Sequence, residues 1–198
     1  LVVASGAIFS VVGEKSKANE SFAILNDFKV GPTVVSTVDD NNGAGITFND
    51  GAAKTVDIWE DPQCPVCKAF EQANGEFVED LVRAKKAKVV FHVLSFLGNE
   101  SVSAANAAYC AADEARYLDF HKAMYLVQPV LENSGFYSTE NLIKIGSYAG
   151  LSSQSFIDCV TKGSKLDYVR AAYESMGKYN VQGTPTVFFN GKLWERKN

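Results

Sequence analysis

The feature that most limits the fold of this sequence is a pair of cysteines at the junction of a strand and a helix. The stretch WEDPQCPVCKAFE, residues 59–71, contains Cys64 and Cys67, with Pro65 directly after the first cysteine. The preceding KTVDIWE, residues 54–60, has the composition of a strand. From Pro65 onward, apolar residues recur at the spacing of a helix: Val66, Phe70, Ala73, Phe77 and Leu81. The pattern predicts a strand that leads into a helix, with the cysteine pair at the start of the helix.

This position favours redox chemistry for the cysteine pair. The first turn of a helix has unpaired N–H groups and a partial positive charge, so a cysteine placed there is stabilised as the thiolate. Pro65 suits the first helical position because it lacks an N–H and has a fixed φ. Cys64 is then the nucleophile, and Cys67, nearly one turn later, is placed to attack a mixed disulfide at Cys64.

Two other interpretations of the pair carry less support. A structural zinc site needs a second pair of ligands, but Cys110 and Cys159 are distant in sequence from each other and from any CxxH motif. Two buried cysteines without a function would need neither Pro65 nor the strand-to-helix setting. We therefore favour the redox interpretation and expect neither a metal nor a cofactor.

Other segments predict the remaining strands of a sheet. VVFHVLSF, residues 89–96, is apolar on both alternating faces, which is typical of a strand covered on both sides. PTVVSTV, residues 32–38, and ITF, residues 46–48, are separated by a turn-rich segment and predict a hairpin. TVFF, the turn Asn190–Gly191 and KLWE predict a second hairpin near the end of the chain.

Four stretches resemble the DsbA-like branch of the thioredoxin superfamily, especially its membrane-anchored, exported members from Gram-positive bacteria and actinobacteria. They are EDPQCPVCKAFE (60–71), AANAAYCA (104–111), YLDFHKAMY (117–125) and NVQGTPTVFFNGK (180–192). The first and last stretches are the more specific. The resemblance extends from Val30 to Leu193.

The resemblance implies an α/β architecture, the thioredoxin fold, with a helical insertion between the central strand and the last hairpin. It divides the chain into residues 1–29, a residual signal anchor with a linker and N-terminal extension, and residues 30–198, the thioredoxin-like domain. The insertion is expected at about residues 98–163. Relatives usually continue past the hairpin into a closing helix, whereas this sequence stops at ERKN.

The resemblance also implies where a substrate binds. Thr184 and Pro185 are expected to be joined by a cis peptide bond and to hold the substrate backbone beside Cys64 by strand-like pairing. Val66 is expected in the same substrate-binding surface, and Pro65 supports the active site.

The chain departs from the family at one supporting position. Many relatives carry an acidic residue on the strand six positions before the first cysteine, where this chain has Ile58. Asp57 should face the other side of the strand because side chains alternate. We therefore expect Glu60 or water to exchange protons with Cys67, and we assign Glu60 as a supporting residue.

Cys110 and Cys159 each lie in a helical pattern. We predict one structural disulfide between them that braces the insertion, because neither has a CxxC setting and export favours oxidation. A second redox pair or two buried free thiols are the alternatives. His92 and His121 are expected in packing or capping roles, and neither is assigned to catalysis.

The N-terminal residues predict a membrane anchor. LVVASGAIFSVV, residues 1–12, is almost entirely apolar and is followed by a polar stretch. Because about 20 residues are needed to cross a bilayer, we interpret the run as the outer end of a signal anchor that holds an extracytoplasmic domain at the cell membrane. The alternative is an ordered helix or strand packed on the domain.

Composition limits the partners. A chain of 198 residues that is 46% hydrophobic fits one domain. It has 23 acidic against 19 basic residues, and no Lys/Arg run is interleaved with aromatic residues. We therefore expect no nucleic-acid partner.

These observations predict an exported thiol-disulfide oxidoreductase, and the leading expectation is an oxidase that introduces disulfides into reduced exported proteins. The family implies a membrane quinone-linked enzyme that reoxidises it. A reductase or isomerase of the same fold, or a non-catalytic peptide-binding module with an inert disulfide, are the alternatives.

We predict that Cys64 has a pKa of about 5 to 7, below the free value of about 8.5, because the helix terminus outweighs the charges of Glu60 and Asp61, which we expect to be exposed. Strongly oxidising relatives carry histidine where this chain has Val66. Val66→His should therefore lower the Cys64 pKa and raise a reduction potential that we expect between about −120 and −230 mV. Thiolate absorbance measures the Cys64 pKa, and equilibration with glutathione measures the reduction potential. A wild-type pKa above about 8, together with the reduction potential of a cytosolic reductant, contradicts the oxidase interpretation.

Overall fold

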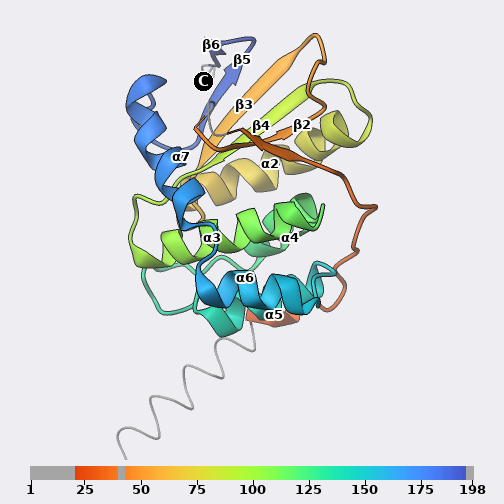
Figure 1. Cartoon of the computed structure of the whole chain (residues 1–198), viewed down its shortest axis with the longest axis vertical. Coiled ribbons are helices and arrows are strands. Elements are labelled where there is room, and N and C mark those ends of the chain that lie inside the picture. The colour runs from red at the N-terminus through yellow and green to blue at the C-terminus, as the bar shows by residue number, and fades with distance from the viewer. Residues whose placement is uncertain (1–20, 40–42, 195–198) are drawn as a thin grey trace, which may run out of the picture.

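The computed structural model describes residues 21–39 and 43–194. The predicted anchor, residues 1–12, lies outside the described residues. Within the described part, no helix is long and apolar enough to span a bilayer. A β-sheet occupies one end of the molecule, and most of the helices are stacked against and beyond it (Figure 1).

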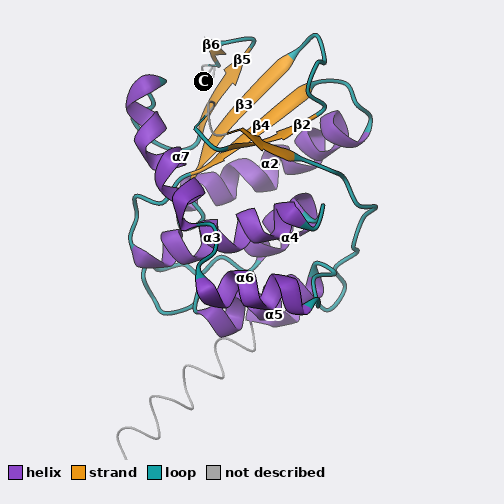
Figure 2. Cartoon of the chain, in the orientation of Figure 1, coloured by secondary structure: helices purple, strands orange, loops and turns teal. Residues whose placement is uncertain are grey.

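The sheet has six strands in the order β1-β2-β4-β3-β5-β6 (Figure 2). The strands are β1 Thr37–Asp39, β2 Gly45–Phe48, β3 Thr55–Glu60, β4 Lys88–Val93, β5 Thr186–Phe189 and β6 Lys192–Leu193. Only β3 and β4 are parallel to each other, and the other neighbours are antiparallel. Both predicted hairpins form, and β4 lies inside the sheet between β2 and β3, as its uniformly apolar sequence predicts.

Six helices lie between β3 and β5 in the described part of the chain. They are α2 Pro65–Arg83, α3 Asn99–Asp113, α4 Tyr117–Leu126, α5 Thr139–Tyr148, α6 Gln154–Lys162 and α7 Leu166–Lys178. The helix α2 connects the parallel strands β3 and β4 and packs on β4 and α4. The helices α3 to α6 come between β4 and α7 and extend away from the sheet (Figure 1).

The helix α2 has the predicted position, but its buried face differs from the apolar spacing in the sequence. Its buried residues are Cys67, Val78 and Val82. Val66 is 60% exposed and Phe77 is 65% exposed, although both belong to the apolar series that predicted the helix. The spacing indicated the helix correctly. Phe70 and Leu81 of the same series do pack against the core, whereas Val66 and Phe77 face outward because the packing of α2 on β4 and α4 decides which side is covered.

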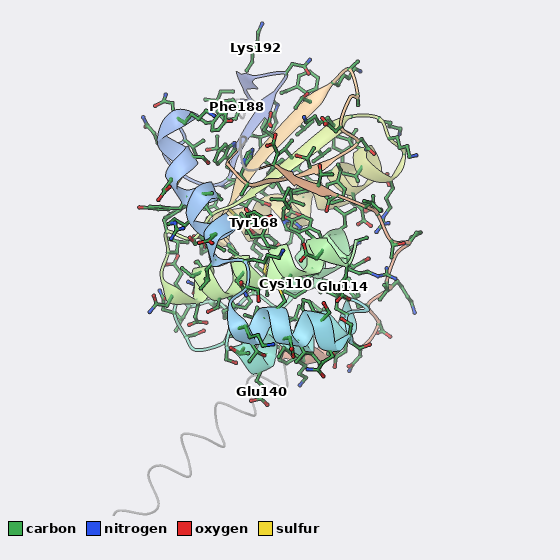
Figure 3. All side chains as sticks on the ribbon, viewed as in Figure 1. Cys110, Glu114, Glu140, Tyr168, Phe188 and Lys192 are labelled. Carbon is green, nitrogen blue, oxygen red and sulfur yellow. A yellow bond between two sulfur atoms is a disulfide. The ribbon has the colours of Figure 1, made fainter. Side chains whose placement is uncertain are left out.

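The predicted disulfide between Cys110 and Cys159 is present and joins α3 to α6. Its Cα atoms are 5.9 Å apart, and the two residues are separated by 49 positions in the sequence. Figure 3 labels Cys110 where α3 lies along α6. Ten residues of α3 are buried, so the bond attaches a largely buried helix to α6.

Replacing both bridging cysteines, Cys110→Ala with Cys159→Ala, should lower the free energy of unfolding by about 2 to 4 kcal/mol, because a long loop is no longer closed in the unfolded chain. Chemical denaturation measures this loss. The matched control is Cys64→Ala with Cys67→Ala, which removes two cysteines and keeps the bridge. A loss below about 0.5 kcal/mol, the usual range of a neutral surface substitution, contradicts the structural role of the bridge.

Candidate active site

Cys64 and Cys67 lie at the N-terminus of α2, directly after the C-terminal end of β3. Cys64 is the N-cap residue and has extended backbone angles, and Pro65 occupies the first turn. The backbone N–H of Cys67 donates to Cys64 Sγ at 3.4 Å. Both side chains are free thiols in this structure. The geometry is the one predicted from the strand-to-helix pattern.

The environment of Cys64 favours its thiolate. A hydrogen bond from the Cys67 side chain is the largest cause, and together with Thr184 and the N–H groups of Cys67 and Val66 it outweighs burial and lowers the Cys64 pKa to about 5. This value is at the lower end of the predicted range. Cys64 is only 7% exposed, so little of its side chain is accessible to solvent.

Cys67 has the opposite environment. Its side chain is 0% exposed, and burial raises its pKa far above the usual range of a thiol. A hydrogen bond with Cys64 and the negative charge of Glu60 act in the same direction. The two thiols, one helical turn apart, are therefore held in different protonation states near neutral pH.

The expectation that Glu60 and Asp61 are exposed is wrong. Glu60 is 4% exposed and Asp61 is 0% exposed, because the helices α3 and α4 cover the end of β3. Burial raises the pKa of Glu60 to about 8 and that of Asp61 to about 6. Their charges are therefore less screened than those of surface carboxylates, and Glu60 acts directly on Cys67.

Buried hydrogen bonds hold the segment between β3 and α2. The Asp61 carboxylate accepts from Ser101 Oγ at 2.6 Å and from the N–H groups of Gln63 and Leu97 at 2.9 and 3.2 Å. The Gln63 side chain donates to Ser101 Oγ at 3.0 Å. These contacts tie the residues before Cys64 to the start of α3.

A second set of hydrogen bonds ties the same segment to the end of α4. Gln128 Nε2 donates to the carbonyl oxygens of Pro62 at 2.7 Å and of Cys64 at 3.0 Å. Tyr125 Oη donates to the Asp61 carbonyl at 3.1 Å. The cysteine turn is thus held from both sides by the helical layer.

Thr184 and Pro185 lie beside the cysteines, as the sequence resemblance implied. The peptide bond between them is cis. The Cys64 thiol lies 3.5 Å from the Thr184 carbonyl oxygen and donates to it when protonated. Val66, the other expected substrate contact, lies next to Cys64 with 60% of its surface exposed.

We expected His121 in a packing or capping role, but its ring lies between two carboxylates. Its Nε2 lies 3.0 Å from Glu60 Oε2, and its Nδ1 lies 3.6 Å from Glu71 Oε2. Burial lowers the pKa of His121, whereas burial and the charge of Glu60 raise the pKa of Glu71 to about 8. We call these three residues the Glu60–Glu71–His121 cluster.

One feature of the sequence indicated the position of Glu71 in this cluster. Glu71 follows Cys67 by four residues, so a helix places the two side chains on the same face. The position of His121 depends on the packing of α4 against α2, which no local pattern indicates. Ile58, where relatives carry an acid, is 1% exposed, and Asp57 lies 3.9 Å from His92 Nε2.

Comparisons with known proteins agree with this geometry. A family model described as Thioredoxin matches residues 46–198. The crystal structure of oxidised DsbA from Mycobacterium tuberculosis has a TM-score of 0.65 and 29% identity over 76% of this chain and 81% of that chain. Disulfide bond formation protein D of Bacillus subtilis is 26% identical over 85% of this chain and 77% of that protein.

A third similarity covers only part of a larger protein. The serine/threonine-protein kinase PknE of Mycobacterium tuberculosis is 28% identical over 163 residues, which make up 71% of this chain and 29% of the kinase. The chain therefore spans less than a third of the length of this curated relative.

The lowered pKa of Cys64 predicts a pH-dependent difference in stability between the reduced and oxidised proteins. Between about pH 5, the folded pKa, and pH 9.0, the ordinary value, the unfolded chain binds more protons at Cys64 than the folded chain. The reduced form should therefore gain stability relative to the disulfide form as pH rises from about 5 to about 8, and lose it again as pH falls.

Parallel denaturation of the two forms across this pH range measures the effect, and ionisable groups distant from the cysteines cancel. The pKa values of Glu60 and Asp61 respond to the Cys64 thiolate, so their contribution is part of the measured difference. Reduced Cys64→Ser is the control, since it lacks the titrating thiol and should follow the disulfide form. A reduced wild type whose relative stability is flat or falls with pH contradicts the thiolate assignment.

Proposed function

Because the chain belongs to the thioredoxin family, and is related within it to thiol-disulfide oxidoreductases of the DsbA type, we propose that it introduces disulfides into reduced exported proteins. The observation that carries this proposal is the placement of Cys64 at the N-terminus of α2, where hydrogen bonds lower its pKa to about 5. Stabilising this thiolate stabilises the reduced enzyme relative to its disulfide. A disulfide whose reduced form is stabilised is an oxidant.

The reaction is a transfer of two electrons from the substrate to the enzyme. A substrate thiolate attacks Cys64 Sγ of the Cys64–Cys67 disulfide, a mixed disulfide forms, and Cys67 leaves as a thiolate that takes up a proton. A second substrate thiolate then attacks the substrate sulfur of the mixed disulfide. The substrate leaves with its new disulfide, and Cys64 leaves as the stabilised thiolate.

Glu60 is the group of this chain that we propose to exchange the proton with Cys67. Its carboxyl group is buried with Cys67 behind the first turn of α2, and the two groups interact electrostatically. Ile58 leaves no acid at the position that many relatives use. Glu60 takes over that role from the last residue of β3.

The substrate-binding surface that we propose is formed by Val66, Thr184 and Pro185. Val66 presents an exposed apolar side chain next to Cys64, and the Thr184 carbonyl lies 3.5 Å from the Cys64 sulfur. An extended substrate segment that pairs with the backbone at Thr184 would therefore carry its cysteine to Cys64.

The location that we propose is outside the cytoplasm, with the predicted N-terminal anchor holding the domain at the membrane. The disulfide between Cys110 and Cys159 supports an oxidising compartment, where such bonds form and persist. The proposed redox partner is a membrane quinone-linked enzyme that reoxidises Cys64 and Cys67 after each cycle.

Two assays separate the oxidase from its alternatives. An oxidase accelerates the refolding of a reduced protein with several disulfides and reduces insulin poorly. A reductase or isomerase of the same fold reduces insulin or repairs scrambled disulfides efficiently. A peptide-binding module with an inert disulfide does neither, and that result excludes the proposed activity.

Cys67→Ser should accumulate covalent substrate adducts through Cys64, because the buried group that displaces the substrate from the mixed disulfide is gone. Cys64→Ser should accumulate almost none, since the remaining thiol of Cys67 is buried and protonated. Non-reducing electrophoresis followed by mass spectrometry measures both variants. Adducts that persist in Cys64→Ser and are absent from Cys67→Ser reverse the roles of the two cysteines.

A further inference from the structure

Two carboxylates and one imidazole converge below the cysteines from three separate elements. Glu60 ends β3, Glu71 lies on α2 and His121 lies on α4. One oxygen of each carboxylate and one nitrogen of the imidazole all lie within 4.8 Å of one another. No spacing in the sequence indicates this set, because its three residues are far apart along the chain.

The cations next to the cluster are engaged elsewhere. Lys122 and Arg83 both pair with Glu79, at 3.2 and 2.7 Å. Lys68 donates to the Gln128 carbonyl at 2.8 Å. Among the described residues, none of these three cations therefore neutralises the cluster.

The carboxylates of the cluster have oxygens without hydrogen-bond donors. Glu60 Oε1 and Glu71 Oε1 are buried and accept no hydrogen bond from an N–H or hydroxyl donor in the described part of the chain, although the two carboxyl groups interact with each other. The side chain of Glu60 is 5% exposed and that of His121 is 6% exposed. Buried carboxylates are normally paired with cations, protonated or bound to a metal. Burial raises the pKa of both Glu60 and Glu71 to about 8, so a bound cation would take the place of their protons.

A cavity gives a cation access to the cluster. It has a volume of about 290 Å³ and lies between α2 and α4, with Glu71 and His121 among the residues that line it. Lys68, Glu79 and Lys122 also line it, so its wall is polar as well as apolar. The cavity is large enough to hold water beside the bound ion.

We propose that the Glu60–Glu71–His121 cluster is a binding site for a divalent transition-metal cation, of which Zn²⁺ is the best match. One imidazole nitrogen and two carboxylate oxygens are ligands that Zn²⁺ accepts, whereas Ca²⁺ and Mg²⁺ prefer oxygen alone. With Zn–ligand distances of about 2.1 Å, tetrahedral ligands lie about 3.4 Å apart. The 3.0 Å between His121 Nε2 and Glu60 Oε2 is close to this spacing. Glu71 Oε2 lies 3.6 Å from the other ring nitrogen, Nδ1, so the Glu71 side chain has to turn toward the ion that Nε2 and Glu60 hold, and water from the cavity supplies the fourth ligand.

Neither Cys64 nor Cys67 is a ligand of this site, although Glu60 belongs both to it and to the proton exchange proposed for Cys67. The site therefore binds its cation in the disulfide form of the protein as well. Since Glu60 interacts electrostatically with Cys67, a bound cation changes the charge that Cys67 experiences. The proposal makes the redox centre responsive to metal without requiring that the protein be an oxidase.

Calorimetric titration of the untagged, oxidised protein with Zn²⁺ tests the site, because the disulfides remove all four thiols as ligands. We expect one Zn²⁺ per chain, with affinity reduced at least about tenfold in Glu71→Gln and in His121→Gln, as expected for the loss of a ligand or its support. Glu76→Gln is the matched control. It removes an exposed carboxylate from the same helix at the rim of the same cavity and should bind as the wild type does.

A second measurement uses the wild type alone and does not depend on the folding of the variants. The chain has two histidines, so ¹⁵N spectra of their rings report on His121 with His92 as an internal reference. Zn²⁺ should shift the ring nitrogens of His121 and leave those of His92 unchanged. Absence of stoichiometric binding, equal affinity in the Glu71→Gln and Glu76→Gln variants, or an unshifted His121 overturns the proposal.

Discussion

The active site depends on the fixed turn between β3 and α2. The carboxylate of Asp61, which is 0% exposed, accepts hydrogen bonds from Ser101 and from two backbone N–H groups, while Gln128 satisfies the carbonyl oxygens of Pro62 and Cys64. Leaving such buried groups unsatisfied costs about 1 to 3 kcal/mol each, so the turn has little freedom to rearrange. The N-terminus of α2 therefore points its N–H groups at one sulfur atom.

That geometry separates two chemically identical thiols. Cys64 lies at the helix terminus and is favoured as the thiolate, whereas Cys67 lies deeper, next to the buried carboxyl group of Glu60, and is favoured as the thiol. The difference in protonation arises because Cys67, one helical turn after Cys64, is more deeply buried. Solvation and hydrogen bonding, rather than any difference in residue type, assign the nucleophile and its partner.

Local patterns predicted the parts of the structure that depend on neighbouring residues. The strand before Cys64, the helix after it, the turn at Asn190 and the buried β4 all follow from composition and spacing. The burial of Glu60 and Asp61 and the contact of His121 with two carboxylates could not be predicted in this way. They arise because α3 and α4, distant in sequence from β3, cover its end, and the exposed Phe77 shows that the same tertiary packing overrides the apolar spacing of α2.

The bridge between α3 and α6 has a consequence for how the protein matures. The helix α3, which supplies Ser101 to the hydrogen-bonded support of the cysteine turn, is joined to α6 by a bond that ribosomal synthesis does not supply. A newly synthesised chain therefore has to lose two electrons at Cys110 and Cys159 before its helical layer reaches full stability. The stability of the folded protein thus depends on an oxidation of two of its own cysteines, which is separate from the chemistry of Cys64 and Cys67.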